Sequence, residues 1–280
     1  MKNGFMVFLA VFVVLLASWG GFVLAPSLQL GRATQVAVLN SSDVYPIGRT
    51  GDANLGLQVY RAYGCAACHT TQVRQDGSVC DVAVTGAGKN LAAVAKAVDE
   101  ITSTDAKFTT NGLPKIILSG VSKPVADEAV DKISAAGGKA EIRIKSVGTD
   151  IARGWGIRRS VAEDFLTDYP VQLGSLRAGP DLANIALRSP DANWHLLHLY
   201  APQAAVKGST MPPFRFLFET RKIVNGVPSP DALVLPKEIA PADGYEVVPT
   251  VEAKQLVAYL LSLRADVPLY DAPFTPSAKP

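Results

Sequence analysis

The chain has 280 residues and a net charge of +2, and charged residues make up only 19% of it, against roughly 25% in ordinary globular proteins. With 48% hydrophobic residues, a disordered, collagen-like or disulfide-dense chain is excluded. The small net charge gives no indication of nucleic-acid binding. Cys, His and Met occur three times each, so every soft metal ligand can be considered by itself.

The N-terminal stretch 4–25 is predominantly apolar, and no charged residue stands between Lys2 and Arg32. A helix of this length spans roughly 33 Å, about the thickness of a bilayer core. The alternative is a cleaved signal peptide, whose apolar region has only about 7–15 residues and ends at a small-residue cleavage site. Because this run is longer and no clean A-x-A site follows it, we expect an uncleaved membrane anchor.

Residues 65–69 are Cys-Ala-Ala-Cys-His, the attachment pattern of c-type haem. Two thiols at this spacing can reach the two vinyl groups of one porphyrin, and the adjoining imidazole can then be an axial ligand of the iron. A short amphipathic helix is predicted over 54–64, directly before the motif. We therefore predict one covalent haem c, bound through Cys65 and Cys68, with His69 as a metal ligand.

A redox C-x-x-C pair or half of a zinc site is the alternative interpretation of the motif. A zinc site needs two further ligands, and Cys80, His195 and His198 are the only Cys and His residues left. A thioredoxin-like pair lies on a strand-to-helix turn and does not need the histidine. Cys80 is predicted to be a buried small hydrophobic residue.

The second axial ligand is predicted to be Met211, because Met1 and Met6 belong to the N-terminal stretch. Met211 stands in GSTMPPF, a loop whose prolines reduce the entropy lost on ligation. A thioether ligand also raises the reduction potential. His195 and His198, three positions apart on a predicted helix and hence on one face, are the alternative ligands.

The remaining segments give weaker indications. The segment 251–264 is an amphipathic helix, which we expect to cross the helix over 54–64. Pro180 and Asp181 suit the first turn of a helix. Loops with a hairpin are expected over 219–250, and the Pro-rich tail 266–280 is expected to be extended.

The stretch 80–145 differs in kind from its surroundings. It is predicted to contain a strand over 81–85, helices over 91–101 and 123–136, and a final strand over 139–145. A unit of this size is large enough to fold alone, though with a small core. We therefore expect an inserted α/β domain.

Outside this insert, the chain resembles the membrane-anchored mono-haem cytochrome c subunit (subunit II) of cbb3-type cytochrome c oxidases. The shared features are the anchor, the haem motif and two more specific blocks, GSxRxGPDL at 174–182 and WHxxHL at 194–199, followed by Met211-Pro212. The chain departs from the family at Tyr169 and Leu173, where the family usually has His and Trp.

This resemblance implies an electron-transfer subunit, in which haem c takes electrons from a donor cytochrome. It passes them to a haem–copper catalytic subunit that assembles with other cytochrome c subunits. It also implies a single-pass protein of the bacterial inner membrane with its soluble part on the periplasmic side. Arg74 and Arg177 are the implied partners of the haem propionates. The alternatives are the cytochrome subunit of a nitric oxide reductase, a stand-alone anchored cytochrome c, and an enzyme such as a peroxidase.

The insert resembles the C-terminal domain of the bacterial ribosomal stalk protein. The matching segments include Thr85-Gly86-Ala87-Gly88-Lys89-Asn90 and Gly120-Val121-Ser122-Lys123. The resemblance implies a βααβαβ-like fold. It does not imply the stalk protein's recruitment of translation factors, because a domain outside the cytoplasm does not meet them.

The expected architecture is a mainly α cytochrome c fold with one N-terminal transmembrane helix, interrupted by a small inserted α/β domain. The expected divisions are an anchor over 4–25, a cytochrome domain split into 45–79 and 151–265, an insert over 80–145 and a tail over 266–280.

Overall fold

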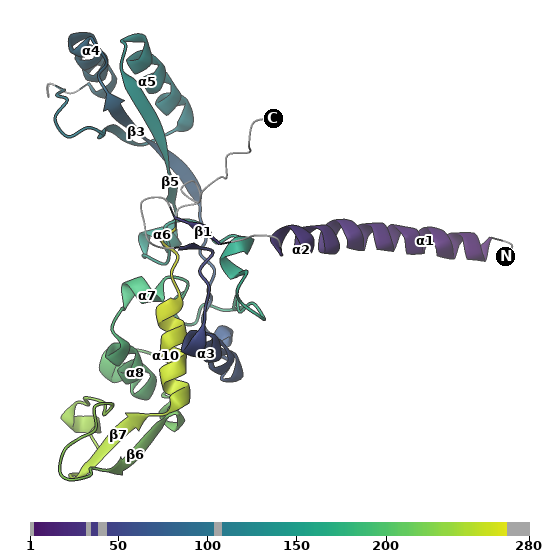
Figure 1. Cartoon of the computed structure of the whole chain (residues 1–280), viewed down its shortest axis with the longest axis vertical. Coiled ribbons are helices and arrows are strands. Elements are labelled where there is room, and N and C mark those ends of the chain that lie inside the picture. The colour runs from purple at the N-terminus through teal and green to yellow at the C-terminus, as the bar shows by residue number, and fades with distance from the viewer. Residues whose placement is uncertain (1–2, 32–34, 39–43, 104–107, 268–280) are drawn as a thin grey trace. The chain divides into compact units, whose positions relative to one another are not determined.

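The structure, a computed structural model, describes residues 3–31, 35–38, 44–103 and 108–267 (Figure 1). Contacts divide the chain into two units. The first combines Met1–Val73 with Ser160–Pro280, and the second is Arg74–Arg159. Most of the predicted Pro-rich tail, from residue 268 onward, lies outside the described residues.

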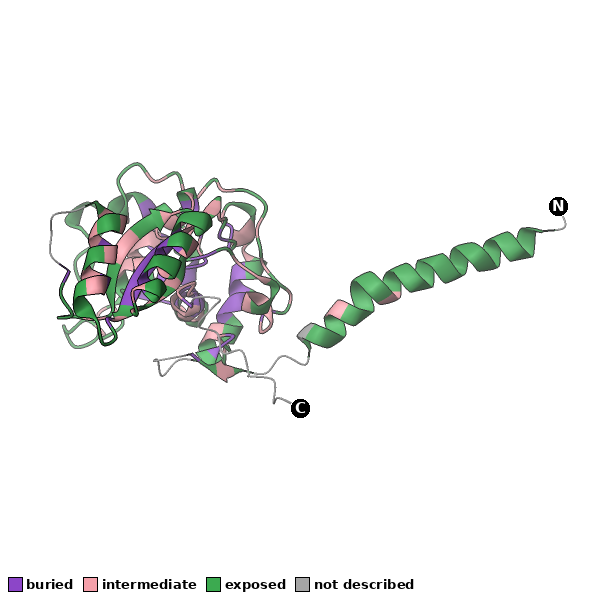
Figure 2. Cartoon of the chain, turned by 90° about the horizontal axis from the view of Figure 1, so that it is seen from above, coloured by how far each residue is buried: buried purple, intermediate pink, exposed green. Residues whose placement is uncertain are grey.

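The chain begins with a long helical segment. It consists of α1 (Gly4–Trp19), a π-helical turn (Gly20–Leu24) and α2 (Ala25–Leu30). The part from Gly4 to Gln29 is long and apolar enough to cross a membrane, and its side chains are exposed along nearly its whole length (Figure 2). Its length and composition thus agree with the expected span.

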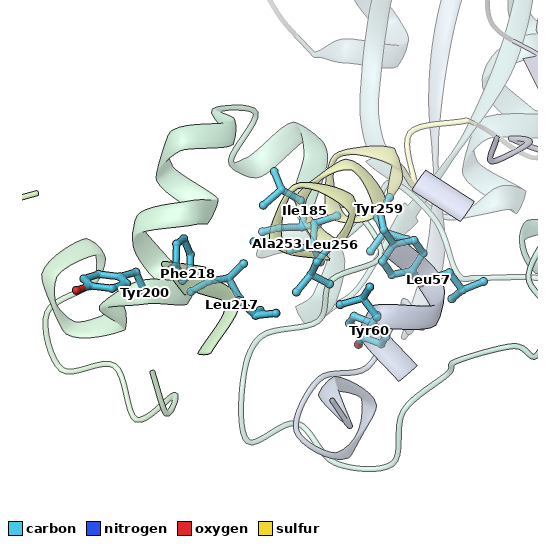
Figure 3. Packing of buried hydrophobic residues seen from close by; sticks show 14 of the residues in the cluster. Leu57, Tyr60, Ile185, Tyr200, Leu217, Phe218, Ala253, Leu256 and Tyr259 are labelled. Atoms are coloured by element: carbon cyan, nitrogen blue, oxygen red, sulfur yellow. The ribbon is translucent and has the colours of Figure 1, made fainter. Parts of the chain in front are cut away.

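The core of the first unit is the crossing of α3 (Gly51–Ala62) with α10 (Val251–Ser262) (Figure 1). Leu57 and Tyr60 of α3 pack against Leu256 and Tyr259 of α10, and all four are at most 2% exposed (Figure 3). The two tyrosine rings lie 5.2 Å apart in a tilted arrangement. The predicted pairing of these helices is therefore present.

Short elements complete the first unit. The helices are α7 (Ile185–Arg188), α8 (Ala192–Tyr200) and α9 (Pro202–Ala205). Strands β1 (Val36–Ala37) and β2 (Val44–Tyr45) pair antiparallel, as do β6 (Phe218–Lys222) and β7 (Tyr245–Pro249). The last pair is the hairpin expected within 219–250. Ile185, Leu199 and Leu217 extend the core around α10.

Two boundaries in the first unit differ from the prediction. Helix α3 begins at Gly51, three residues before the predicted start. Pro180 and Asp181 do not begin a helix, because α7 starts at Ile185. The Asp181 carboxylate instead accepts hydrogen bonds from the Thr70 hydroxyl and the Gln72 amide, which are distant in the sequence.

The second unit contains β3 (Gly77–Gly86), α4 (Leu91–Thr102), β4 (Lys115–Val121), α5 (Lys123–Ala135), β5 (Lys139–Val147) and α6 (Thr149–Ala152). The strands form an antiparallel sheet in the order β4-β3-β5. Alternate residues of β3 point to one face of the sheet. Those of one set, Cys80, Val82 and Val84, are buried against both α4 and α5. The prediction that Cys80 is buried is confirmed at 4% exposure.

The order of elements corrects the expected βααβαβ pattern of the insert. Among the described residues one helix, α4, lies between β3 and β4, so the observed order is βαβαβ. The segment that follows α4 begins with Ser103 in the left-handed region and later contains Gly112, at φ +79°, and Pro114. Positive φ and proline both oppose a helix at these positions.

Gly56 is required where α3 crosses α10. A Cβ at this position would overlap the Gln255 carbonyl group and lie 2.8 Å from the Tyr259 Cβ. We expect Gly56→Ala to lower the free energy of unfolding by about 1–3 kcal/mol, as overpacking does. Leu55→Ala, at an adjacent side chain that is 50% exposed, should cost within about 0.5 kcal/mol. Urea unfolding of the two variants measures the difference, and equal values would contradict this packing.

Candidate haem site

The haem motif follows directly from the end of α3. Gly64 has φ +69°, a conformation that glycine adopts without steric cost, and it reverses the chain into a 3₁₀ turn over Cys65–Ala67. The His69 amide then donates to the Cys65 carbonyl at 3.0 Å. Cys65 is half-buried, Cys68 is exposed and neither forms a disulfide. The turn thus presents two free thiols beside one imidazole.

The His69 ring is oriented by a single carbonyl group. Its Nδ1 lies 2.7 Å from the Pro180 oxygen. Because a carbonyl only accepts, Nδ1 carries the hydrogen and Nε2 keeps its lone pair. Burial lowers the pKa of His69, although the Pro180 hydrogen bond opposes this shift. The ring is therefore a neutral imidazole whose Nε2 lone pair can bind a metal ion.

Two glycines allow the loop 173–182 to lie against the motif. A Cβ on Gly174, whose φ is +78°, would lie 2.8 Å from the Thr70 Cα, and one on Gly179 would overlap the His69 ring. Backbone hydrogen bonds join the two segments, including Gly179 N to Cys68 O at 2.9 Å and Leu182 N to Thr70 O at 2.7 Å. The GSxRxGPDL block thus forms the support of the His69 imidazole.

Asp181 is the buried centre of this support, with no exposed surface. Its carboxylate accepts from the Thr70 hydroxyl at 2.5 Å and from the backbone amides of Gln72 and Ala183 at 2.9 and 2.8 Å. Arg177 donates to the Thr70 hydroxyl and the Gln72 carbonyl at 2.8 and 2.6 Å, and pairs with Asp181 at 3.5 Å. The network fixes Arg177 beside the His69 loop.

A second, half-buried guanidinium lies beside Asp181, that of Arg188, which no pattern in the sequence indicates. Arg188 donates to the Asp181 carbonyl, and its buried Nε has no hydrogen-bond partner among the described residues. Burial lowers its pKa, against the effect of the Asp181 charge. Arg74, by contrast, belongs to the second unit, where its amide donates to Asp150 at 2.8 Å.

Met211 and Cys65 border the same hydrophobic cluster, the one built on α3 and α10. The Met211 side chain is half-buried, and the segment around it forms a loop as expected. The Phe214 amide donates to the Leu199 carbonyl at 2.8 Å, which ties the loop to α8. The predicted ligand loop therefore lies at the rim of the core that carries the haem motif.

His195 and His198 both lie on α8, as predicted, but in different surroundings. His195 is 3% exposed, and its Nε2 is 2.8 Å from the Ser189 carbonyl oxygen. His198 stacks on Trp194, with ring centres 5.0 Å apart and an interplanar angle of 5°. Its Nδ1 is buried and has no partner among the described residues. Burial lowers the pKa of His198, and the nearby His195 and His69 charges lower it further.

Two other interpretations of the motif lack support in the geometry. In the described part of the chain, no group of three His, Cys, Asp or Glu side chains is placed to hold a metal ion. Burial raises the pKa of the Cys65 thiol to about 11, whereas reactive redox thiols have lowered values. The Cys65 thiol thus differs from a reactive redox thiol.

Comparison with protein families matches two parts of the chain. Residues 143–232 match the family described as "Cytochrome C oxidase, mono-heme subunit/FixO". This range contains Arg177, Pro180, His198 and Met211, but not the motif at 65–69. Residues 80–143 match "Ribosomal protein L7/L12 C-terminal domain". Both resemblances predicted from the sequence are therefore confirmed.

Individual relatives match the inserted segment. The chain is 45% identical over 65 residues to the large ribosomal subunit protein bL12 of Burkholderia ambifaria. It is 46% identical over 66 residues to bL12 of Methylobacillus flagellatus and 41% over 66 residues to that of Streptomyces virginiae. Each match covers 22% of this chain and 52% of the relative. The chain thus spans about half the length of these relatives.

Gly179→Ala tests the support of the axial imidazole. Because the new methyl group would lie 2.7 Å from Nδ1 and 2.8 Å from Nε2 of His69, we expect the ring to turn away from its orientation. The unfolding free energy should fall by about 1–3 kcal/mol, and a high-spin fraction should appear in the absorption spectrum of the haem-loaded protein.

Gly77→Ala is the matched control, since its Cβ would meet the Val147 Cγ2 at an ordinary 3.7 Å. It should leave both the spectrum and the stability unchanged. A fully low-spin spectrum and unaltered stability in Gly179→Ala would show that the close approach to His69 is unimportant.

Proposed function

We propose that the chain is the mono-haem electron-transfer subunit of a cbb3-type cytochrome c oxidase. Haem c is attached through Cys65 and Cys68, and His69 and Met211 are its axial ligands. The subunit takes electrons from a donor cytochrome and passes them to the haem–copper catalytic subunit, where dioxygen is reduced. The observation that carries this proposal is the His69 ring, whose Nδ1 is held by Pro180 and whose Nε2 is free.

The other groups at the site fit a c-type haem. The Cys65 thiol and the Met211 thioether border a single core, and neither Cys65 nor Cys68 is bridged. Three buried polar atoms beside it lack partners among the described residues: Tyr60 Oη, Arg188 Nε and His198 Nδ1. A haem brings carboxylate acceptors, which buried donors need. Guanidinium groups pair well with carboxylates, so Arg177, Arg188 and, by resemblance, Arg74 are the candidate partners of the propionates.

The chain's own residues hold and tune the cofactor. The haem iron supplies one-electron redox chemistry, and the protein sets its potential through axial ligands and burial. The Pro180 hydrogen bond increases electron donation by the His69 ring and fixes its direction. The Met211 thioether favours the reduced state. The two thioether bonds of the motif keep the haem in place during repeated electron transfer.

The helix over Gly4–Gln29 is proposed to anchor the subunit in the bacterial inner membrane. Haem c is attached outside the cytoplasm, so the soluble part would lie on the periplasmic side. The family match favours an oxidase subunit over the cytochrome subunit of a nitric oxide reductase or a stand-alone cytochrome. The inserted domain is related in sequence to the ribosomal domain, and we propose that it does not keep that domain's role.

Replacing Met211 by Ala tests the axial ligand and separates an electron carrier from a peroxidase-like enzyme. We expect loss of the Met-to-iron charge-transfer band, because the thioether no longer binds. The reduction equilibrium should shift by at least about tenfold, which is about 59 mV for a one-electron couple. Met6→Ala, in the N-terminal helix, should change neither. An intact band in the Met211 variant would contradict the proposed ligation and favour an open iron position.

Excision of the insert tests which part of the chain associates with the oxidase. Val79 and Lys145 are cross-strand partners in the β3–β5 ribbon, so an Asn-Gly turn between them can replace residues 80–144. We expect the shortened chain to keep its haem spectrum and reduction potential. It should also co-purify from membranes with a haem–copper subunit, as we expect of the full chain.

If the haem–copper subunit co-purifies with the full chain but not with the shortened chain, the insert is the part that associates with it. Absence of that subunit from the full chain as well would contradict the proposed function.

A further inference from the structure

His198 carries a buried ring nitrogen that the proposed ligation does not use. Its Nδ1 has no hydrogen-bond partner among the residues that the structure describes. Its ring is held flat against Trp194 at 5.0 Å, so the direction of Nδ1 is set by packing. A buried ring nitrogen without a partner costs free energy of about 1–3 kcal/mol. Such a nitrogen needs a hydrogen-bond partner, and none is present among the described residues.

The surroundings of His198 indicate where that partner lies. The next residue, Leu199, accepts from Phe214 at the end of the Met211 loop at 2.8 Å. His198 therefore precedes the residue of α8 to which the Met211 loop is tied.

Other groups serve the charged acceptors of the haem. Arg177 and Arg188 both contact Asp181. They are cationic partners suited to propionates. The Met211 loop, which is tied to α8 at Leu199, carries an acceptor of a different kind, the Met211 sulfur. A thioether accepts weakly and has no hydrogen to give, so His198 must be the donor of such a pair.

We propose that His198 is a positioning residue whose Nδ1–H donates a hydrogen bond to the thioether sulfur of Met211. The inference rests on the proposed function, because it takes Met211 as the axial ligand. The hydrogen bond holds the thioether in one orientation and withdraws electron density from it. A weaker electron donor favours ferrous iron, so the bond raises the reduction potential.

The contrast with His195 supports this assignment. His195 stands on the same helix, but its Nε2 is satisfied by Ser189 at 2.8 Å. It is thus a structural residue that joins α8 to the end of α7. Of the two histidines in the WHxxHL block, His198 alone keeps an unpartnered buried nitrogen in the described structure.

Two substitutions in the full-length, haem-loaded protein test the proposal. His198→Phe keeps a ring to stack on Trp194 but cannot donate. His198→Asn keeps an N–H donor close to the place of Nδ1. We expect His198→Phe to lower the equilibrium constant for reduction by roughly threefold to tenfold, the range of a net hydrogen bond, or up to about 59 mV. The charge-transfer band should also move, and His198→Asn should restore both.

His195→Gln, which keeps a donor near the place of Nε2, is the control and should leave potential and band unchanged. The inference is overturned if His198→Phe behaves like the unaltered protein, or if its potential falls while the band stays in place, since the acceptor would then be a propionate. Loss of the band in His198→Phe but not in Met211→Ala would make His198 the ligand and overturn the proposed function too.

Discussion

The hydrogen bond from the His69 ring to the Pro180 carbonyl connects segments 111 residues apart in the sequence. It fixes the ring tautomer and leaves Nε2 free, which a metal ligand requires. It also demands glycine at 179, since any side chain there would overlap the ring. The hydrogen bonds of the Asp181 carboxylate to Thr70 and Gln72 hold the same loop in place. The local chemistry of the motif thus depends on a distant loop being held within hydrogen-bond distance.

An insertion between these two segments is tolerated because its ends are adjacent. Val73 and Ser160, where the first unit is interrupted, are joined by two hydrogen bonds of 2.9 and 3.1 Å. Inside the second unit, Gly77 pairs with Val147 at the start of the β3–β5 ribbon. A domain whose two termini lie close together can be inserted without separating the flanking segments of the first unit. This arrangement explains how the haem motif and its support remain together around a domain of the ribosomal type.

Sequence reasoning worked best where the determinants are local. The helices over 91–101, 123–136 and 251–264 were predicted to within two residues, because apolar periodicity and caps such as Asn90 and Thr250 define them. The motif identified the thiols and His69 for the same reason. Contacts between distant segments were missed: Asp181 was taken for a helix start, and Arg188 on the short α7 gave no signal. Sequence patterns also do not reveal the strand β4, since it pairs with the distant strand β3, for example Lys115 with Val84 and Val121 with Cys80.

The central claim is that the two thiols of the motif carry one haem held against the Pro180 loop. Peptide mapping by mass spectrometry of the chain purified from bacterial membranes tests it most directly. The account predicts one haem, joined by thioether bonds to both Cys65 and Cys68, and an unmodified Cys80. Free thiols at 65 and 68 in the purified chain, open to alkylation and without haem, would contradict it.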